Sequence, residues 1–317
     1  MISFARTDTS LVGRWWWTVD RWTLLAVALL IAIGTLLTLA ASPAVAEKLN
    51  LQSQHFVLRQ MIFLPMAMAV MFVVSLMSPR GVRRISAAGL VISLLLVVAT
   101  LFLGAEIKGA TRWLQFAGLS LQPSEFVKPC FAVVAAWILA EQRQREGMAG
   151  ALICCALFAL VVWLLVSQPD FGMTAVVAAV WFGQCFIAGL SMLWVGLLAG
   201  LGLIGAILAY ATIPHVASRI DRFLDPASGD SYQIDRAMDA FGQGGLLGRG
   251  PGEGMVKRVL PDAHTDFIFS VAGEEFGLIA CLIIVALFGF ITLRGFARLL
   301  REEDLFVLLA AAGLLTQ

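Results

Sequence analysis

The sequence has few charged residues, and those present carry almost no excess of one sign. Charged side chains make up 14% of the 317 residues, with 22 basic against 21 acidic, while apolar residues make up 60%. A protein that binds nucleic acid needs a basic surface, so we expect no partner of that class. The apolar content exceeds what a soluble core needs and indicates an integral membrane protein.

Cysteine is also sparse and shows no functional spacing. The five residues lie inside apolar runs, without a C-x-x-C pair and without the regular spacing of a disulfide framework. We interpret them as small core residues and not as metal ligands or redox groups. They are Cys130, Cys154, Cys155, Cys185 and Cys281.

Long apolar runs are the main feature that is present. Eight are long enough, or nearly so, to cross a bilayer, and a ninth begins near Leu305 and reaches Gln317. We therefore predict an all-α, polytopic inner-membrane helical bundle with eight complete transmembrane helices and the start of a ninth. We expect residues 1–317 to form a single integral-membrane domain, truncated at its C-terminus. The eight runs span residues 22–43, 60–77, 85–103, 125–140, 150–167, 173–189, 191–213 and 266–293.

Lysine and arginine in the short loops predict the orientation. The N-terminal segment and the loops on its side carry eleven arginines, whereas the short loops opposite carry only Lys48, Arg59, Lys108 and Arg112. Positively charged loops stay in the cytoplasm, so we expect a cytoplasmic N-terminus. The eleven are Arg6, Arg14, Arg21, Arg80, Arg83, Arg84, Arg143, Arg145, Arg294, Arg298 and Arg301.

Residues 214–265 form the longest loop, which this topology places on the periplasmic side. Residues 230–241 fit a short amphipathic helix that is capped by Asp230 or Ser231. Seven glycines follow within residues 242–254. We expect a flexible, turn-rich segment there, whose backbone can approach a ligand closely.

Two charged residues open the fourth apolar run. Glu125 and Lys128, in QPSEFVKP, are three residues apart, so on a helix they share a face and can form an ion pair that lowers the cost of burying each charge. The pair either fastens its helix to neighbouring helices or lines a cavity in which Lys128 meets a phosphate.

Two residues of the outer loops also admit two interpretations each. Arg112, beside Trp113 in GATRWL, is either an interfacial anchor or a cation for an anionic ligand. Asp170, in SQPDFG, either caps the following helix or belongs to a polar site.

Asp266, in LPDAHTDFIFSVAGEEFG, is the strongest candidate for chemistry. A carboxylate beside an apolar helix is costly in a membrane unless it has a use. If the helix begins near Asp266, its dipole favours the anion, and Gly273 and Gly277 fall close to the same, inward face. Glu274 lies within the apolar run, and His264 is a candidate to orient a substrate or metal. From composition and spacing alone, a transporter and a membrane-embedded transferase are equally supported.

The order of the motifs resembles one known family. GATRWL, LQPSEFVKP, SQPDFG, RFLDP with DSYQ, GGLLGRGPGEG and LPDAHTDFIFSVAGEEFG follow one another as in the SEDS family of bacterial cell-wall proteins, which includes FtsW, RodA and SpoVE. The stretch GRGPGEG is more similar to the division protein FtsW than to RodA. Members have about ten helices, so the resemblance implies that a complete ninth and a tenth are missing here.

The resemblance implies a peptidoglycan glycosyltransferase that polymerises lipid II during cell division. It maps the family's essential aspartate to Asp266, which would act as a general base or as a ligand of a divalent metal, Mg²⁺ or Mn²⁺. It maps the cavity pair to Glu125 and Lys128. Its other motif residues fall on Arg112, Asp170 and Gln233, and with His264 and Glu274 these complete the expected substrate site.

The implied partners are a class B penicillin-binding protein, which cross-links the product as a transpeptidase, and other membrane proteins of the divisome. The site would face the periplasm from the bacterial inner membrane. Two alternatives use the same sequence differently. A lipid II flippase also needs charges that line a cavity, although no inverted internal repeat is visible. A divisome scaffold without chemistry of its own would not need Asp266.

Overall fold

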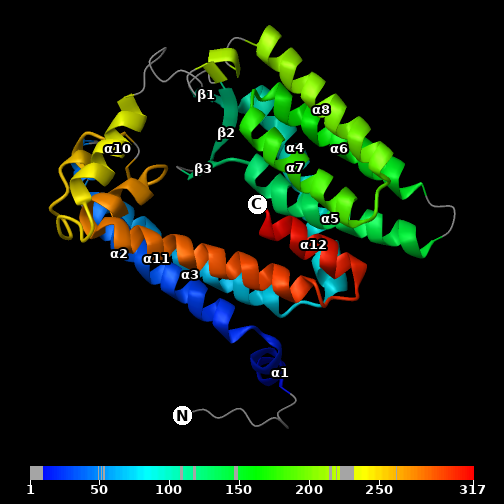
Figure 1. The fold of residues 1–317 in the computed structure, drawn as a ribbon, viewed down its shortest axis with the longest axis horizontal. Coiled ribbons are helices and arrows are strands. Elements are labelled where there is room, and N and C mark those ends of the chain that lie inside the picture. The colour runs from blue at the N-terminus through cyan, green and yellow to red at the C-terminus, as the bar shows by residue number, and fades with distance from the viewer. Residues whose placement is uncertain are drawn as a thin grey trace. The chain divides into compact units, whose positions relative to one another are not determined.

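The computed structural model describes residues 10–48, 50, 52, 54–107, 110–116, 119–145, 149–213, 216–218, 220–221, 232–261 and 263–317. These residues are mostly helical, and the chain divides into two compact units (Figure 1). The first unit comprises Met1–Leu76 and Ser218–Arg294, and the second comprises Met77–Ala217 and Gly295–Gln317. The expectation of a single integral-membrane domain over residues 1–317 stays a prediction.

Three long helices form most of the first unit, after the short α1 (Leu11–Thr18). They are α2 (Arg21–Lys48), α3 (His55–Ser75) and α11 (Ile268–Leu299), whose last five residues belong to the second unit. No residue of α3 is buried within the protein, although the helix is apolar along its length. Such a surface suits contact with lipid hydrocarbon.

Contacts along the length of both helices hold α11 beside α2 in the first unit. Leu37 of α2 packs in one small core with Ala272 and Ile284 of α11. Near the other end, the guanidinium of Arg294 pairs with the carboxylate of Asp20, at 2.5 and 2.9 Å. The pair lies beside the first turn of α2, where a charged group can reach the membrane surface.

The polar part of the first unit includes α10 (Tyr232–Gly244) and the short 3-10 helix η2 (Val256–Arg258). The structure confirms the predicted amphipathic helix, because Ala237 and Ala240 are buried while Asp235 and Asp239 are exposed. Its predicted cap at residues 230 and 231 lies outside the described residues.

The second unit is built around α5 (Ser124–Gln144), which buries ten residues and packs against α4, α6, α7 and α12. Phe131 and Ala135 of α5 are completely buried. The other helices of this unit, in chain order, are α4 (Pro79–Leu103), α6 (Gly150–Ser167), α7 (Phe171–Ile187), α8 (Met192–Thr212) and α12 (Leu305–Leu315).

A small antiparallel sheet is the one addition, among the described residues, to the all-α fold that the sequence predicts. It consists of β1 (Ala105–Ile107), β2 (Ala110–Phe116) and β3 (Leu119–Leu121), in that order. Ala105 pairs with Trp113, and Gln115 pairs with Ser120. The sequence signal was two short runs that each end at a two-residue connection with glycine, a pattern typical of hairpins.

Each predicted apolar run corresponds to a helix in the structure. Among the described residues, five helices are long and apolar enough to cross a membrane by length and composition, namely α2, α3, α4, α6 and α11. Shorter apolar helices are α7, residues 196–212 of α8, and α12. The chain is thus a membrane protein with several helical spans, and the count of eight complete spans stays a prediction.

Candidate functional site

Asp266 lies in a turn directly before α11, and its side chain is exposed. Its neighbours Phe267 and Ile268 pack against a buried cluster that includes Ala41 of α2 and Val271 of α11. These apolar neighbours anchor the turn to the cluster, while the carboxylate of Asp266 stays exposed.

The prediction that the helix begins near Asp266 is confirmed, but the prediction that Asp266 lies on its inward face is wrong. The helix begins at Ile268, so Asp266 does not share a helical face with Gly273 and Gly277. The carboxylate still lies beside the N-terminal end of α11, where the helix dipole favours an anion.

The buried carboxylate of Glu274 binds the backbone of the segment that precedes the turn. The side chain is completely buried. It accepts hydrogen bonds from the backbone N–H groups of Met255 (2.6 Å), Val256 (2.7 Å) and Lys257 (3.1 Å). Three donors on one carboxylate offset the cost of burying its charge.

Glu275, equally buried, forms an ion pair with the ammonium of Lys257. Its second oxygen accepts from the backbone N–H of Gly252 at 3.0 Å. The same ammonium donates to the carbonyls of Ala40 (2.9 Å) and Gly252 (3.1 Å). Lys257 has three protons, and each finds an acceptor, which is the condition under which a buried ion pair is tolerated.

The glycine-rich stretch, residues 242–254, provides hydrogen-bond partners at a break in α11. The helix is interrupted at Gly277, whose φ of 78° and ψ of −177° are not helical. A broken helix leaves backbone groups without their usual partners, and this stretch supplies them. The bonds join Arg249 N–H to Glu274 O (3.0 Å), Gly250 N–H to Glu275 O (3.0 Å), Leu278 N–H to Gly245 O (2.9 Å) and Ile279 N–H to Leu246 O (3.3 Å).

The contact between α10 and α11 depends on a pair of glycines. A Cβ atom at Gly273 would lie 2.3 Å from a ring carbon of Phe241, and one at Gly244 would lie 1.8 Å from the carbonyl oxygen of Gly273. The close packing that the sequence predicted for Gly273 is therefore present, but α10 and its loop provide the partner surface.

His264 and Gln233 occupy different surroundings in the first unit. The imidazole of His264 packs against the ring of Phe56 of α3, with ring centroids 4.1 Å apart and the ring planes tilted by 41°. Gln233 is exposed in the first turn of α10. Substrate contact by these two residues and by Glu274 stays a prediction. For Glu274, both carboxylate oxygens already accept backbone hydrogen bonds.

The second unit brings Arg112 and Asp170 together. Arg112 lies on β2, and its guanidinium is 3.5 Å from the Asp170 carboxylate. It also donates to the carbonyls of Gln168, at 3.4 Å, and Pro169. Asp170 caps α7 by accepting from the Met173 N–H at 3.4 Å, which confirms the capping interpretation. The arginine therefore fastens the sheet to the turn before α7.

Glu125 and Lys128, in the first two turns of α5, form the predicted ion pair at 2.8 Å. The expected burial is wrong for the carboxylate, because the side chain of Glu125 is 51% exposed, against 20% for Lys128. Ser124 and Val127, in the same turns of α5, are completely buried, so the pair lies on the less covered face of this end of the helix.

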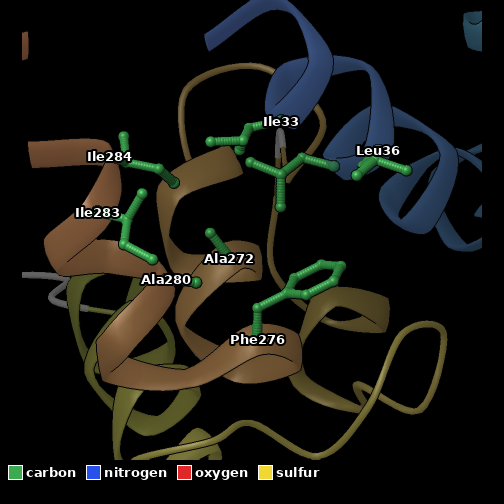
Figure 2. A pocket seen from close by; sticks show the side chains of 8 residues that line it. Ile33, Leu36, Ala272, Phe276, Ala280, Ile283 and Ile284 are labelled. Atoms are coloured by element: carbon green, nitrogen blue, oxygen red, sulfur yellow. The ribbon is translucent and has the colours of Figure 1, made fainter. Parts of the chain in front are cut away.

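An apolar cavity of about 170 Å³ lies between α2 and α11 in the first unit (Figure 2). Ala272 and Phe276 line it before the break at Gly277, Ala280 and Ile283 line it after the break, and Ile33 comes from α2. Its lining offers no polar group, so hydrocarbon is the chemistry that fits it and sugar is not.

The described residues do not by themselves form a metal site. Within them, no group of three or more His, Cys, Asp and Glu side chains is arranged to hold a metal ion. Asp262, a further carboxylate near Asp266 in sequence, lies outside the described residues.

Sequence reasoning missed two features that shape these two sites. Glu275 was noted as an acid within the apolar run beside Glu274, but its ion pair with Lys257 was not predicted. Gln122 was also missed. Its amide donates to Asp170 at 3.4 Å and to Ser124 at 3.1 Å.

Comparison with known proteins identifies relatives over almost the whole chain. The family described as "Cell cycle protein", covering FtsW, RodA and SpoVE, matches residues 21–316. A probable peptidoglycan glycosyltransferase FtsW of Caulobacter vibrioides is 44% identical over 313 residues, which cover 98% of this chain and 80% of that one. The corresponding protein of Allochromatium vinosum is 36% identical over 292 residues, which cover 87% and 71%.

Two solved structures share the fold. A mutant of the rod shape determining protein RodA of Thermus thermophilus is 25% identical, with a TM-score of 0.65, covering 94% of this chain and 81% of that one. A chain from a peptidoglycan synthase complex that coordinates polymerization and crosslinking is 26% identical, with a TM-score of 0.70, covering 93% and 82%. The chain therefore belongs to the FtsW, RodA and SpoVE family of cell cycle proteins.

Proposed function

We propose that this chain is a peptidoglycan glycosyltransferase of the FtsW type, which polymerises lipid II into glycan strands during cell division. The identity with relatives of that description over nearly the whole chain supports the reaction class. The proposed site rests on Asp266, whose carboxylate is exposed in a turn. The packing of its neighbours against a buried cluster anchors that turn.

In the proposed reaction, Asp266 is the general base. The 4-hydroxyl of the GlcNAc of one lipid II attacks the anomeric carbon of a lipid-linked MurNAc from the face opposite the leaving group. The new C–O bond forms as the bond to undecaprenyl pyrophosphate breaks, so the configuration inverts. The hydroxyl proton passes to the Asp266 carboxylate, and the electron pair of the broken bond leaves with the pyrophosphate.

Lys128 is the better candidate to stabilise the charge that grows on the pyrophosphate. One of its three protons is used by Glu125, and the side chain is 20% exposed. Arg112 instead directs its guanidinium at Asp170 and at the carbonyls of Gln168 and Pro169. Arg112 and Asp170 would then shape the substrate site by holding the turn before α7.

The proposal includes an orientation in the bacterial inner membrane, with a cytoplasmic N-terminus and with Asp266 at the periplasmic side. Arginines near the start of α4 and near the ends of α5 and α11 support it, because those ends would share the cytoplasmic face with the N-terminus. We propose a class B penicillin-binding protein as partner. The similarity to a synthase complex that couples polymerization to crosslinking supports this choice.

Glycan synthesis from purified lipid II tests the proposal. The full chain is reconstituted in liposomes with a class B penicillin-binding protein, as wild type and as Asp266→Asn, with and without added Mg²⁺ or Mn²⁺. We expect glycan strands from the wild type and a rate lower by on the order of 10²–10⁴ from the variant, the usual contribution of a general base. Both proteins should bind lipid II. Equal polymerisation by Asp266→Asn would contradict the site, and transfer of fluorescent lipid II across the bilayer without polymerisation would indicate a flippase.

A further inference from the structure

We propose that Glu274, Glu275 and Lys257 are positioning residues that set the geometry of the turn carrying Asp266. This proposal rests on the proposed function, because it takes Asp266 to be the base. The three side chains join the two ends of that turn to each other. They are among the most deeply buried charged groups of the described chain.

The two ends of the Asp266 segment are fixed to each other. The segment leaves η2 after Arg258 and enters α11 at Ile268. The N–H groups that open η2 are bonded to the carboxylate of Glu274, which lies in the second turn of α11. One side chain therefore joins the start of the segment to the helix in which the segment ends, and a loop with joined ends has few conformations left.

A second set of contacts joins η2 to α2. The ammonium of Lys257 pairs with Glu275 and donates to the carbonyl of Ala40. The next residue of α2, Ala41, packs in the buried cluster with Leu260, Ala263 and Val271, two of which belong to the segment itself. The segment is thus held at both ends by charged groups and between them by apolar burial.

The hydrogen bonds to Glu274 require an ionised carboxylate, and an uncharged side chain of the same shape cannot replace it. One carboxylate oxygen accepts from Met255 and Val256, and the other accepts from Lys257. In Glu274→Gln, the amide NH₂ would face at least one of these N–H groups whichever way it is turned, and two donors cannot bond each other. We expect η2 to move away from α11, and the Asp266 segment to move with it.

A displaced base affects turnover more than binding. A shift of about 1 Å in a reacting group can lower a rate by on the order of 10²-fold, since proton transfer needs a near-attack geometry. Binding of lipid II is spread over a large headgroup and its tail, so it should change little. A purely structural role would instead lower the amount of folded protein and leave the turnover of each folded molecule unchanged.

The experiment compares Glu274→Gln and Lys257→Met with matched controls in the full chain with its penicillin-binding partner. Glu253→Gln and Arg258→Met make the same chemical changes at exposed neighbours in the same stretch. Hydrogen exchange of peptides that cover residues 252–267 is measured together with kcat and KM for lipid II, normalised to folded protein. Glu274→Asp, which keeps the charge and shortens the side chain, serves if Glu274→Gln does not fold.

We expect faster exchange across residues 252–267 in the Glu274 and Lys257 variants. Their kcat should fall by roughly 10–100-fold, with KM within about twofold. The controls should match the wild type in both measurements. Unchanged exchange, or faster exchange with unchanged kcat, would overturn the proposal. Absence of glycan from the wild type would instead refute the proposed function, and the exchange measurement would still test whether Glu274 fixes the segment.

Discussion

Gly248 and Glu275 approach so closely that no side chain fits at Gly248. A Cβ atom there would lie 2.2 Å from the carbonyl oxygen of Glu275 and 2.4 Å from its carbonyl carbon. Gly248 also has a φ of 81°, which residues with a side chain rarely adopt. The glycine stretch thus lies against the break in α11 with backbone touching backbone.

We predict that Gly248→Ala loses far more stability than Gly245→Ala. Both glycines have positive φ, so each substitution costs roughly 1–2 kcal/mol in backbone strain. At Gly245 no other atom lies within 4 Å of the added methyl group, whereas at Gly248 the methyl group meets the backbone of Glu275. Thermal unfolding of the purified variants in detergent measures the difference. Equal losses would show that the two backbones do not meet as described.

This close approach could not be predicted from the glycine composition alone. Seven glycines in residues 242–254 indicate many turns, and the sequence interpretation was a flexible loop. The structure instead bonds the stretch to Glu274 and Glu275, about twenty residues further on. Spacing in the sequence predicts contacts only between residues one or two helical turns apart. It does not predict which carboxylate accepts hydrogen bonds from a distant loop.

Asp266→Ala should insert and unfold like the wild type. The side chain is exposed in a turn, and surface substitutions of this kind usually change stability by less than about 0.5 kcal/mol. Loss of glycan synthesis with an unchanged melting temperature would separate chemistry from folding. A lower yield of folded protein, in proportion to the lost activity, would argue that Asp266 is structural.

Arg112→Lys should weaken the second unit, because an ammonium does not reproduce a planar guanidinium. Arg112 directs its donors at the Asp170 carboxylate and at two carbonyls. We expect a loss of about 1.5–3 kcal/mol, the range for hydrogen bonds to charged groups. The double variant Arg112→Lys, Asp170→Asn should lose less than the sum of the single losses. Additive losses in thermal unfolding would show that the two side chains act independently.

Helix positions followed from the sequence better than these polar contacts did. Apolar runs predict spans because a helix that crosses the hydrocarbon core needs apolar residues along its whole length. For Arg112 and Asp170 the sequence left two interpretations each, since a strand and a helix cap 58 residues apart meet only through the fold. Asp266 was singled out correctly as a carboxylate at a helix entrance, but its place outside α11 depends on how Phe267 and Ile268 pack.

The last prediction concerns the coupling between Glu125 and Lys128. A desolvated ion pair would lose about 3–5 kcal/mol when one partner is removed. The structure leaves Glu125 half exposed, so solvent screens the pair, and we expect a coupling of only about 0.2–0.5 kcal/mol in a double-mutant cycle of stability.

Activity should respond differently from stability at this pair. If Lys128 meets the pyrophosphate, Lys128→Ala lowers glycan synthesis while its melting temperature stays close to that of the wild type. Glu125→Gln leaves the ammonium in place and should reduce activity less. Arg145→Ala, at the other end of α5, controls for the loss of one positive charge from an ion pair, because Arg145 pairs with Glu141. A stability coupling of several kcal/mol, with activity lost only in proportion to folded protein, would make the pair a structural clamp and remove Lys128 from the substrate site.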